Sequence, residues 1–206
     1  MKFSSVFYKF CVSLLRPIVK IFFPYEVVGK ENVDKISGGY ILCSNHLSAW
    51  DPIFLMIVHP RPVYFMAKSE LFKNRILSRI LYAVGAFPVK RGKGDGDAIK
   101  RATEISSSGK ILGIFIEGTR SKTGEFLRPR SGVALVASET AAPILPVCIT
   151  GSSEDNKIHV FKKTVIVYGE PIIQGKINID NNARKEIKER TQEIMESIKC
   201  LRRVEI

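Results

Sequence analysis

The sequence predicts an α/β fold: a single domain with a largely parallel central sheet flanked by helices, preceded by an N-terminal amphipathic helical segment that associates with membranes. Short apolar runs typical of buried strands alternate along the chain with longer stretches of helical periodicity. Strands that alternate with helices usually build a parallel sheet. The 206 residues, 45% of them hydrophobic, suffice for one sizeable core, and no internal repeat or long linker divides them.

Residues 1–24 are predicted to form the amphipathic segment, and residues 25–206 the domain. Basic positions interrupt the apolar run, so a bilayer-spanning helix is not expected, and no small-residue cleavage site marks a signal peptide. Such a helix suits the interface of an anionic membrane, with Pro17 kinking or splitting it. The alternative is that it packs on its own domain. The apolar stripe consists of Phe3, Phe7, Phe10, Leu14, Ile18 and Ile21, and the basic side carries Lys2, Lys9, Arg16 and Lys20.

The first half of the domain is predicted to hold four short strands and two helices. Gly29 ends the first strand, and Pro60 and Pro62 end the first helix. The second helix has apolar residues at helical spacing from Ile76 to Val84. The predicted strands are 25–28, 40–43, 63–67 and a short run within 85–92, and the predicted helices are 51–59 and 76–84.

The second half is predicted to continue the same alternation. Gly109 suits the C-terminal cap of the helix that precedes the apolar run at residues 111–116. The chain ends in an amphipathic helix that starts at Ala183 and is expected to pack on the core. The predicted helices are 97–107 and 131–139, the predicted strands are 111–116 and 144–150, and residues 160–161 are expected to pair with 164–168.

The composition narrows the class of partner. The chain has 32 lysines and arginines against 20 acidic residues, a formal net charge of +12. This excess favours nucleic acid, an anionic membrane surface, or an acidic substrate or protein. The four cysteines form no CxxC pair, which argues against a zinc site and a disulfide framework and favours reduced thiols in a cytosolic environment.

The polar stretch of residues 43–52 holds the main candidate for catalysis. A buried strand ends there, a loop carries His46, and Asp51 before proline is typical of a helix N-cap. A histidine acts as a general base when one ring nitrogen faces the substrate and a partner on the other fixes the tautomer. Asp51 supplies that partner if the loop folds back. The alternative is that its carboxylate only caps the amides of Ile53 or Phe54.

Three glycines and two histidines elsewhere are given no functional role. Gly92, Gly94 and Gly96 lack the strand–GxGxxG–helix context of a phosphate loop, and a surface turn is the preferred interpretation. His59 and His159 lie in no motif and are interpreted as ordinary surface or helix-end residues.

Four segments stand in order along the chain: Asn45-His46 with Asp51, residues 85–91, residues 115–121 and residues 144–147. Together they resemble the glycerolipid acyltransferase family, whose best-known members are the bacterial 1-acyl-glycerol-3-phosphate acyltransferases. The histidine–four residues–aspartate signature becomes specific when it is joined to the Glu-Gly-Thr-Arg-Ser and Pro-Val-Lys-Arg blocks. The resemblance spans about residues 40–150. Ile116 departs from it, because the family usually has proline before the glutamate, and we expect a change in loop stiffness rather than in chemistry.

The resemblance implies transfer of a fatty acyl group from acyl-CoA or acyl-carrier protein to the sn-2 hydroxyl of 1-acyl-sn-glycerol 3-phosphate, giving phosphatidic acid in phospholipid biosynthesis. His46 takes the proton of that hydroxyl, and Asp51 orients and stabilises the imidazolium. Such base catalysis is typically worth a factor of about 100 to 10,000. The hydroxyl attacks the thioester directly, in agreement with the lack of a Gly-x-Ser-x-Gly elbow. No cofactor beyond the acyl donor and no metal is expected, and no His-Glu-x-x-His motif occurs.

The acceptor's phosphate is expected beside arginines at strand ends. Arg91 and Arg120 each follow a strand-like run, the usual place for ligand residues in open α/β sheets, and guanidinium groups bind phosphate in a bidentate way. In the family, Glu117, Gly118 and Thr119 line the acceptor site, with Glu117 at the glycerol part and Gly118 allowing close approach of the backbone. Additional candidates are Asn45, Lys90, Ser121 and Arg130.

Several alternatives remain open beside this prediction. One is a related acyltransferase for glycerol 3-phosphate or another lysolipid, although small size and the lack of an extra N-terminal domain favour lysophosphatidic acid. A nucleic-acid-binding module explains the charge but not the His46/Asp51 pair, and RNA-recognition, zinc-knuckle and helix-turn-helix motifs are absent. A non-catalytic membrane-remodelling relative is expected to lack His46 or Asp51. The predicted partners are therefore an anionic membrane surface, the acyl donor and lysophosphatidic acid, without nucleic acid, at the cytoplasmic face of the cell membrane as a peripheral or monotopic protein.

Overall fold

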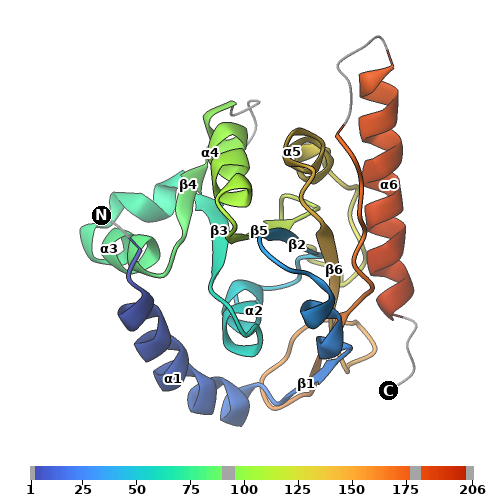
Figure 1. Ribbon diagram of the computed structural model, residues 1–206. Helices are drawn as coiled ribbons and strands as arrows, with labels where there is room; N and C mark the ends of the chain where they lie inside the picture. Colours follow the sequence, from blue (N-terminus) through green and yellow to red (C-terminus); the bar gives the residue numbers. More distant parts are fainter. Residues whose placement is uncertain (1–2, 90–95, 177–181, 203–206) are drawn as a thin grey trace.

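The computed structural model describes residues 3–89, 96–176 and 182–202, and in this part of the chain a seven-stranded sheet lies between two layers of helices (Figure 1). The strand order is β1-β7-β6-β2-β5-β3-β4, and every neighbouring pair is parallel except β6 with β7. The prediction of an α/β domain with a largely parallel sheet is confirmed. The strands are β1 (Tyr25–Val28), β2 (Tyr40–Ser44), β3 (Val63–Lys68), β4 (Phe87–Val89), β5 (Ile111–Phe115), β6 (Ile144–Gly151) and β7 (Thr164–Tyr168).

The helices follow the predicted periodicity, with ends shifted by a residue or two. Two 3₁₀ helices, η1 (Lys30–Lys35) and η2 (Ser69–Lys73), were not predicted, because such short turns carry no apolar period. The α-helices are α1 (Ser5–Phe22), α2 (Asp51–Val58), α3 (Arg75–Ala83), α4 (Gly96–Ser107), α5 (Gly132–Thr140) and α6 (Ala183–Arg202).

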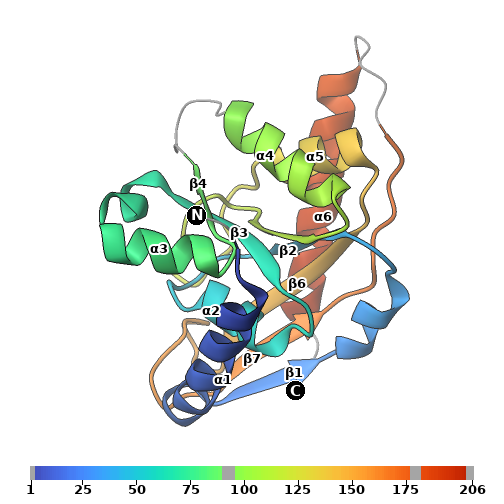
Figure 2. The ribbon, with the colours of Figure 1, turned by 60° about the vertical axis from the view of Figure 1, so that its left-hand side comes forward.

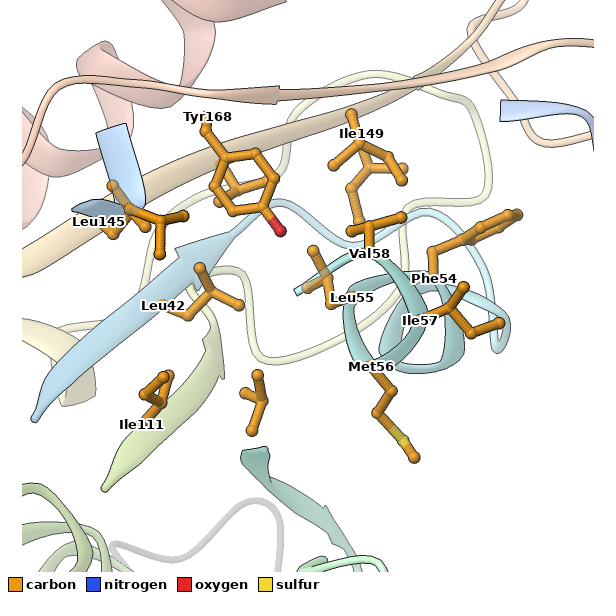
Figure 3. Close-up of a cluster of buried hydrophobic side chains, with 14 of the residues drawn as sticks. Leu42, Phe54, Leu55, Met56, Ile57, Val58, Ile111, Leu145, Ile149 and Tyr168 are labelled. Carbon is orange, nitrogen blue, oxygen red and sulfur yellow. The ribbon is translucent and has the colours of Figure 1, made fainter. Parts of the chain in front are cut away.

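Helices α1 and α2 cover one face of the sheet. Figure 3 shows Leu55 and Val58 of α2 beside Leu42 of β2, Ile149 of β6 and Tyr168 of β7, all in one buried apolar cluster. Side chains alternate along a strand, so the residues on either side of Leu42 point to the opposite face. There they pack against α4, α5 and α6, which lie across the sheet from α1 and α2 (Figure 2). Burial on both faces explains why β2 is apolar along almost its whole length.

Helix α1 has two apolar faces. Tyr8 and Val19 are buried in the core cluster, with Val12 and Leu15 packed beside them. The other face exposes Val6, Phe10, Leu14, Ile18 and Ile21. The helix is therefore packed on the domain and also presents an apolar stripe. No helix in the described ranges is both long enough and apolar enough to cross a bilayer.

One expectation about α1 needs correction. The helix is continuous from Ser5 to Phe22, so Pro17 does not split it. Arg16 is exposed, as its place on the basic side predicts, and its Nη2 also donates a hydrogen bond to the carbonyl of Ile57 at 2.8 Å. The sequence pattern did not predict this contact because it needs the position of α2.

The predicted pairing of residues 160–161 with 164–168 is wrong. Phe161 has a φ of +62°, in the left-handed region, which no extended strand accommodates. Residues 164–168 do form a strand, β7, but it pairs in parallel with β1 and antiparallel with β6. The chain at Phe161 instead bonds back to α1, because its N–H donates to the carbonyl of Phe22 at 2.6 Å.

Candidate active site

The loop that carries His46 begins at the end of β2 and is anchored by Asn45. Nδ2 of Asn45 donates to the carbonyl of Ile149, and its Oδ1 accepts from the Ile149 N–H, both at 2.8 Å. Asn45 is completely buried, and it lines neither of the two cavities described below. Its side chain thus fixes the loop to β6, whereas the sequence proposed it as a substrate ligand.

The structure brings His46 and Asp51 into contact. Nδ1 of His46 lies 2.7 Å from Oδ2 of Asp51. The same oxygen accepts the backbone N–H groups of Leu47 at 2.6 Å and Ser48 at 2.9 Å. Three donors therefore converge on one carboxylate oxygen. Asp51 is completely buried, so this oxygen is shielded from water.

Asp51 differs from the predicted N-cap in one respect. Trp50 occupies the N-cap position of α2, and Asp51 is the first helical residue. Its carboxylate accepts from amides before the helix, so the alternative in which it only caps Ile53 or Phe54 is also wrong. The loop folds back over the helix start, which is what a contact with His46 requires.

This contact assigns the proton of a neutral His46 ring to Nδ1, because a carboxylate can only accept. Nε2 then carries the lone pair, and it forms no hydrogen bond with any residue in the described ranges. His46 lines a cavity of about 370 Å³. The arrangement can remove a proton from a hydroxyl that enters this cavity.

An aromatic stack holds the imidazole from one side. The ring of Phe115, the last residue of β5, lies with its centroid 4.0 Å from that of His46 at an interplanar angle of 15°. Phe65 stacks in turn on Phe115, at 5.6 Å and 14°. A Cβ at Gly113 would fall 2.3 Å from the Phe65 ring, so only glycine leaves room for this stack. Phe115 therefore restricts rotation of the His46 ring.

The loop after β5 is tied to the His46 loop at two points. The N–H of Ile116 donates to the carbonyl of Ser44 at 2.9 Å, and that of Ser121 donates to the carbonyl of His46 at 2.8 Å. Gly118 turns the chain between them with a φ of +67°. A proline at position 116 would lack the first of these donors, so isoleucine allows a bond that proline could not form. Ser121 thereby fixes the backbone of the site.

Glu117 lies on the inner side of this loop and is only 2% exposed. Neither of its carboxylate oxygens forms a hydrogen bond with a described group. Burial raises the pKa of Glu117 to about 7. The nearby backbone groups of Leu127 and His46 partly offset this rise, although neither is placed to form a hydrogen bond with the carboxylate. Near neutral pH this carboxyl can therefore accept or donate a hydrogen bond to a substrate.

Arg130 crosses the backbone of the same loop. A Cβ at Gly118 would lie 2.8 Å from Cδ and 3.1 Å from Nε of Arg130, so the glycine makes room for the arginine. Arg130 and Thr119 line the His46 cavity together with apolar side chains that include Met66 and Val89. The cavity thus combines the imidazole of His46, a cation and apolar walls.

A second cavity, of about 750 Å³, adjoins the first. Thr119 and Arg130 line both, and Glu117 lines the larger one. The rest of its wall comes from residues 127–131, which lead into α5, and from the first half of α6.

The other basic residues predicted for the site, Arg120, Lys90 and Arg91, are not found in the walls of these cavities among the described residues. Arg120 is exposed on the loop and lines neither cavity. Lys90 and Arg91 lie outside the described residues, as do Gly92 and Gly94.

The other two histidines lie apart from the site. His59 is the C-cap of α2, in agreement with the predicted helix-end position, and it is buried, with Nε2 2.5 Å from the hydroxyl of Tyr40. Burial lowers the pKa of His59 to about 4. His159 contacts the carboxylate of Asp155 at 3.0 Å on the surface. Within the described ranges, no cluster of three or more His, Cys, Asp or Glu side chains is placed to hold a metal ion.

Sequence reasoning missed the stacking by Phe115 and the wall of the larger cavity. Phe115 directly precedes the Ile116-Glu117 pair, so its place at the end of a strand was the available signal. For the larger cavity, the signal was a pair of cations one helical turn apart, Arg184 and Lys188.

Comparison with known proteins identifies relatives of the chain. A family model described as Acyltransferase matches residues 24–150. A 1-acyl-sn-glycerol-3-phosphate acyltransferase of Bacillus subtilis (strain 168) is 34% identical over 170 residues, which are 82% of this chain and 83% of that protein. A protein of the same name from Streptococcus pneumoniae is 32% identical over 146 residues, 68% of this chain and 54% of that protein.

One solved structure shares the fold. The crystal structure of the 1-acyl-sn-glycerophosphate (LPA) acyltransferase PlsC from Thermotoga maritima superposes with a TM-score of 0.66 at 24% identity. The match covers 92% of this chain and 80% of that chain.

Proposed function

The chain belongs to the acyltransferase family, and we propose that it transfers a fatty acyl group from acyl-CoA or acyl-carrier protein to the sn-2 hydroxyl of 1-acyl-sn-glycerol 3-phosphate. The product is phosphatidic acid. The observation that carries this proposal is the buried His46–Asp51 pair, in which His46 lines a cavity with a cation and apolar walls. The names of the two bacterial relatives support the choice of acceptor.

His46 is proposed to act as the general base. Nε2 takes the proton of the acceptor hydroxyl while its oxygen attacks the thioester carbonyl and a C–O bond forms. The tetrahedral intermediate then collapses, the C–S bond breaks, and the imidazolium returns the proton to the departing thiolate. Asp51 stabilises the imidazolium through its 2.7 Å contact with Nδ1. The proton taken from the hydroxyl leaves with the thiol, so the reaction needs no nucleophile from the protein.

The acceptor is proposed to bind where the loop after β5 meets the His46 loop. Glu117 contacts the glycerol part, and Gly118 and Thr119 let it approach the backbone. Arg120 and Arg91 hold the phosphate, and the path of Arg130 across Gly118 supports a part for that residue too. Met66 and Val89 in the wall of the His46 cavity suit an acyl chain.

A thiol-release assay tests this function. Purified protein is given lysophosphatidic acid with a panel of acyl-CoA and acyl-carrier-protein donors. We expect release that requires the acceptor and disappears in His46→Ala, with the folded state of the variant checked by circular dichroism. Arg120→Ala should raise mainly the KM for the acceptor. Release with glycerol 3-phosphate or another lysolipid, but not with lysophosphatidic acid, would change the acceptor, and wild-type turnover by His46→Ala would overturn the role of the base.

We further propose that residues 1–24 attach the domain to the cytoplasmic face of an anionic membrane as a peripheral segment. The support is the exposed stripe of α1, which includes Phe10, Leu14 and Ile18. Lys9 and Lys20 are exposed on the same helix, where they suit anionic headgroups. This position would bring the His46 cavity to the surface where lysophospholipids reside.

A further inference from the structure

The larger cavity has a cationic wall, and the proposed reaction so far gives a role only to Arg130 among its cations. It lies between the segment that leads into α5 and the first half of α6, two helices that lie side by side in Figures 1 and 2. Among the described residues, four cations line it: Arg128, Arg130, Arg184 and Lys188. The one acidic residue among the described residues of its wall is Glu117, which is buried and whose pKa burial raises to about 7.

The four cations form no ion pair with a residue in the described ranges. Two of them, Arg184 and Lys188, lie on α6, and the other four cations of that helix are all paired. Arg184 and Lys188 are spaced four residues apart, so their like charges destabilise the helix unless an anion lies between them. The paired residues are Lys185 with Glu189, Arg190 with Glu186, Lys199 with Glu196, and Arg202 with Glu125.

The cavity also communicates with the catalytic residue. Thr119 and Arg130 line both this cavity and the smaller one that contains His46. A long ligand can therefore place a reactive carbon beside His46 and extend an anionic part between α5 and α6.

We propose that this basic cavity binds the phosphorylated pantetheine carrier of the acyl donor, an assignment that rests on the proposed function. The acceptor contains one phosphate, of charge about −2. A volume of about 750 Å³ is in the range of sites for whole small molecules and far exceeds one phosphate group. The pyrophosphate and 3′-phosphate of coenzyme A carry about four negative charges, which suit Arg128, Arg184 and Lys188 together with Arg130, a residue that the acceptor site shares. Acyl-carrier protein is acidic and carries its acyl group on a pantetheine that is attached through the same kind of phosphate.

The test is the double variant Arg184→Gln with Lys188→Gln, measured by thiol release with full-length protein. We expect the KM for palmitoyl-CoA or for palmitoyl-carrier protein to rise about tenfold or more, while the KM for lysophosphatidic acid and kcat stay within about twofold. The donor whose KM rises identifies the carrier. The matched control, Lys185→Gln with Lys199→Gln, removes the same charge from the same helix and should leave both KM values unchanged.

Binding of desulfo-coenzyme A, a non-reactive donor analogue, measured by calorimetry separates this cavity from the proposed function. If wild type binds the analogue, the double variant binds it less tightly and no thiol is released, the cavity assignment stands and the proposed function is wrong. Turnover with an unchanged donor KM in the double variant would keep the function and overturn the cavity assignment. A rise confined to the acceptor KM would also overturn it, because the cations would then bind the lysolipid phosphate.

Discussion

Replacing Asp51 by asparagine should separate the charge of this carboxylate from its hydrogen bonds. The backbone N–H groups of Leu47 and Ser48 point at Oδ2, so the asparagine carbonyl oxygen must take that place. Its NH₂ group then takes the place of Oδ1, which is buried and has no partner among the described residues. His46 keeps an acceptor for Nδ1–H and therefore keeps its tautomer. Only the negative charge is lost.

The size of the effect follows from this geometry. A hydrogen bond to a charged group contributes about 1.5–3 kcal/mol and a neutral one about 0.5–1.5 kcal/mol. The difference of about 1–2 kcal/mol acts on the imidazolium of the transition state, so kcat should fall about 5- to 30-fold. The unpartnered NH₂ group should lower the free energy of unfolding by about 1–3 kcal/mol.

The measurements are kcat from thiol release and the free energy of unfolding from urea denaturation. Asp51→Ala is the control, because it removes the acceptor of all three donors and should lose as much activity as His46→Ala. Asp51→Asn with the same loss as His46→Ala would refute the reasoning, since the amide would then have turned its NH₂ group toward the ring. Unchanged kcat would show that the carboxylate charge does not contribute to catalysis.

Three further outcomes are expected. Burial raises the folded-state pKa of Glu117 from its ordinary 4.5 to about 7, so the unfolded chain loses this proton first and the free energy of unfolding falls as the pH rises between these values. The Glu117→Gln variant lacks this proton, so its free energy of unfolding relative to wild type should rise by about 3 kcal/mol from pH 4 to pH 8. Urea titrations at the two pH values measure this difference, and a constant difference would contradict the pKa shift. Phe115→Leu should lower kcat about 3- to 10-fold with an unchanged acceptor KM, through loss of the stack on His46; steady-state kinetics with both substrates checks this. Phe10, Leu14 and Ile18 changed together to serine should abolish sedimentation with phosphatidylglycerol vesicles without lowering Tm, and unaltered binding would assign membrane contact to another surface.

The parts of the site that sequence could predict are local in the chain. Asp51 lies five residues from His46, and the polar loop between a strand and a helix leaves few ways to separate them. The stack of Phe115 on His46 was not accessible in this way. It depends on the register that pairs Ser44 of β2 with Phe115 of β5, two residues that are far apart in sequence.

The fold shows the same division. Apolar runs located almost every strand, because burial on both faces leaves a continuous apolar signal. The place of β7 between β1 and β6 was missed, since strand order arises from long-range pairing. For α1, the pattern identified the apolar stripe around Phe10 but not the inner face around Val19, because apolar residues occupy both sides of that helix. Periodicity alone does not say which side meets the core.

The isoleucine at position 116 has a consequence for experiment. Its N–H is bonded to the carbonyl of Ser44, at the junction of the two strands that carry His46 and Phe115. Proline at this position would have no amide proton to follow. In this chain, hydrogen–deuterium exchange at that single amide therefore reports the separation of β2 from β5 beside His46. Comparing its exchange rate with and without a bound substrate measures how much the substrate suppresses the opening of this hydrogen bond.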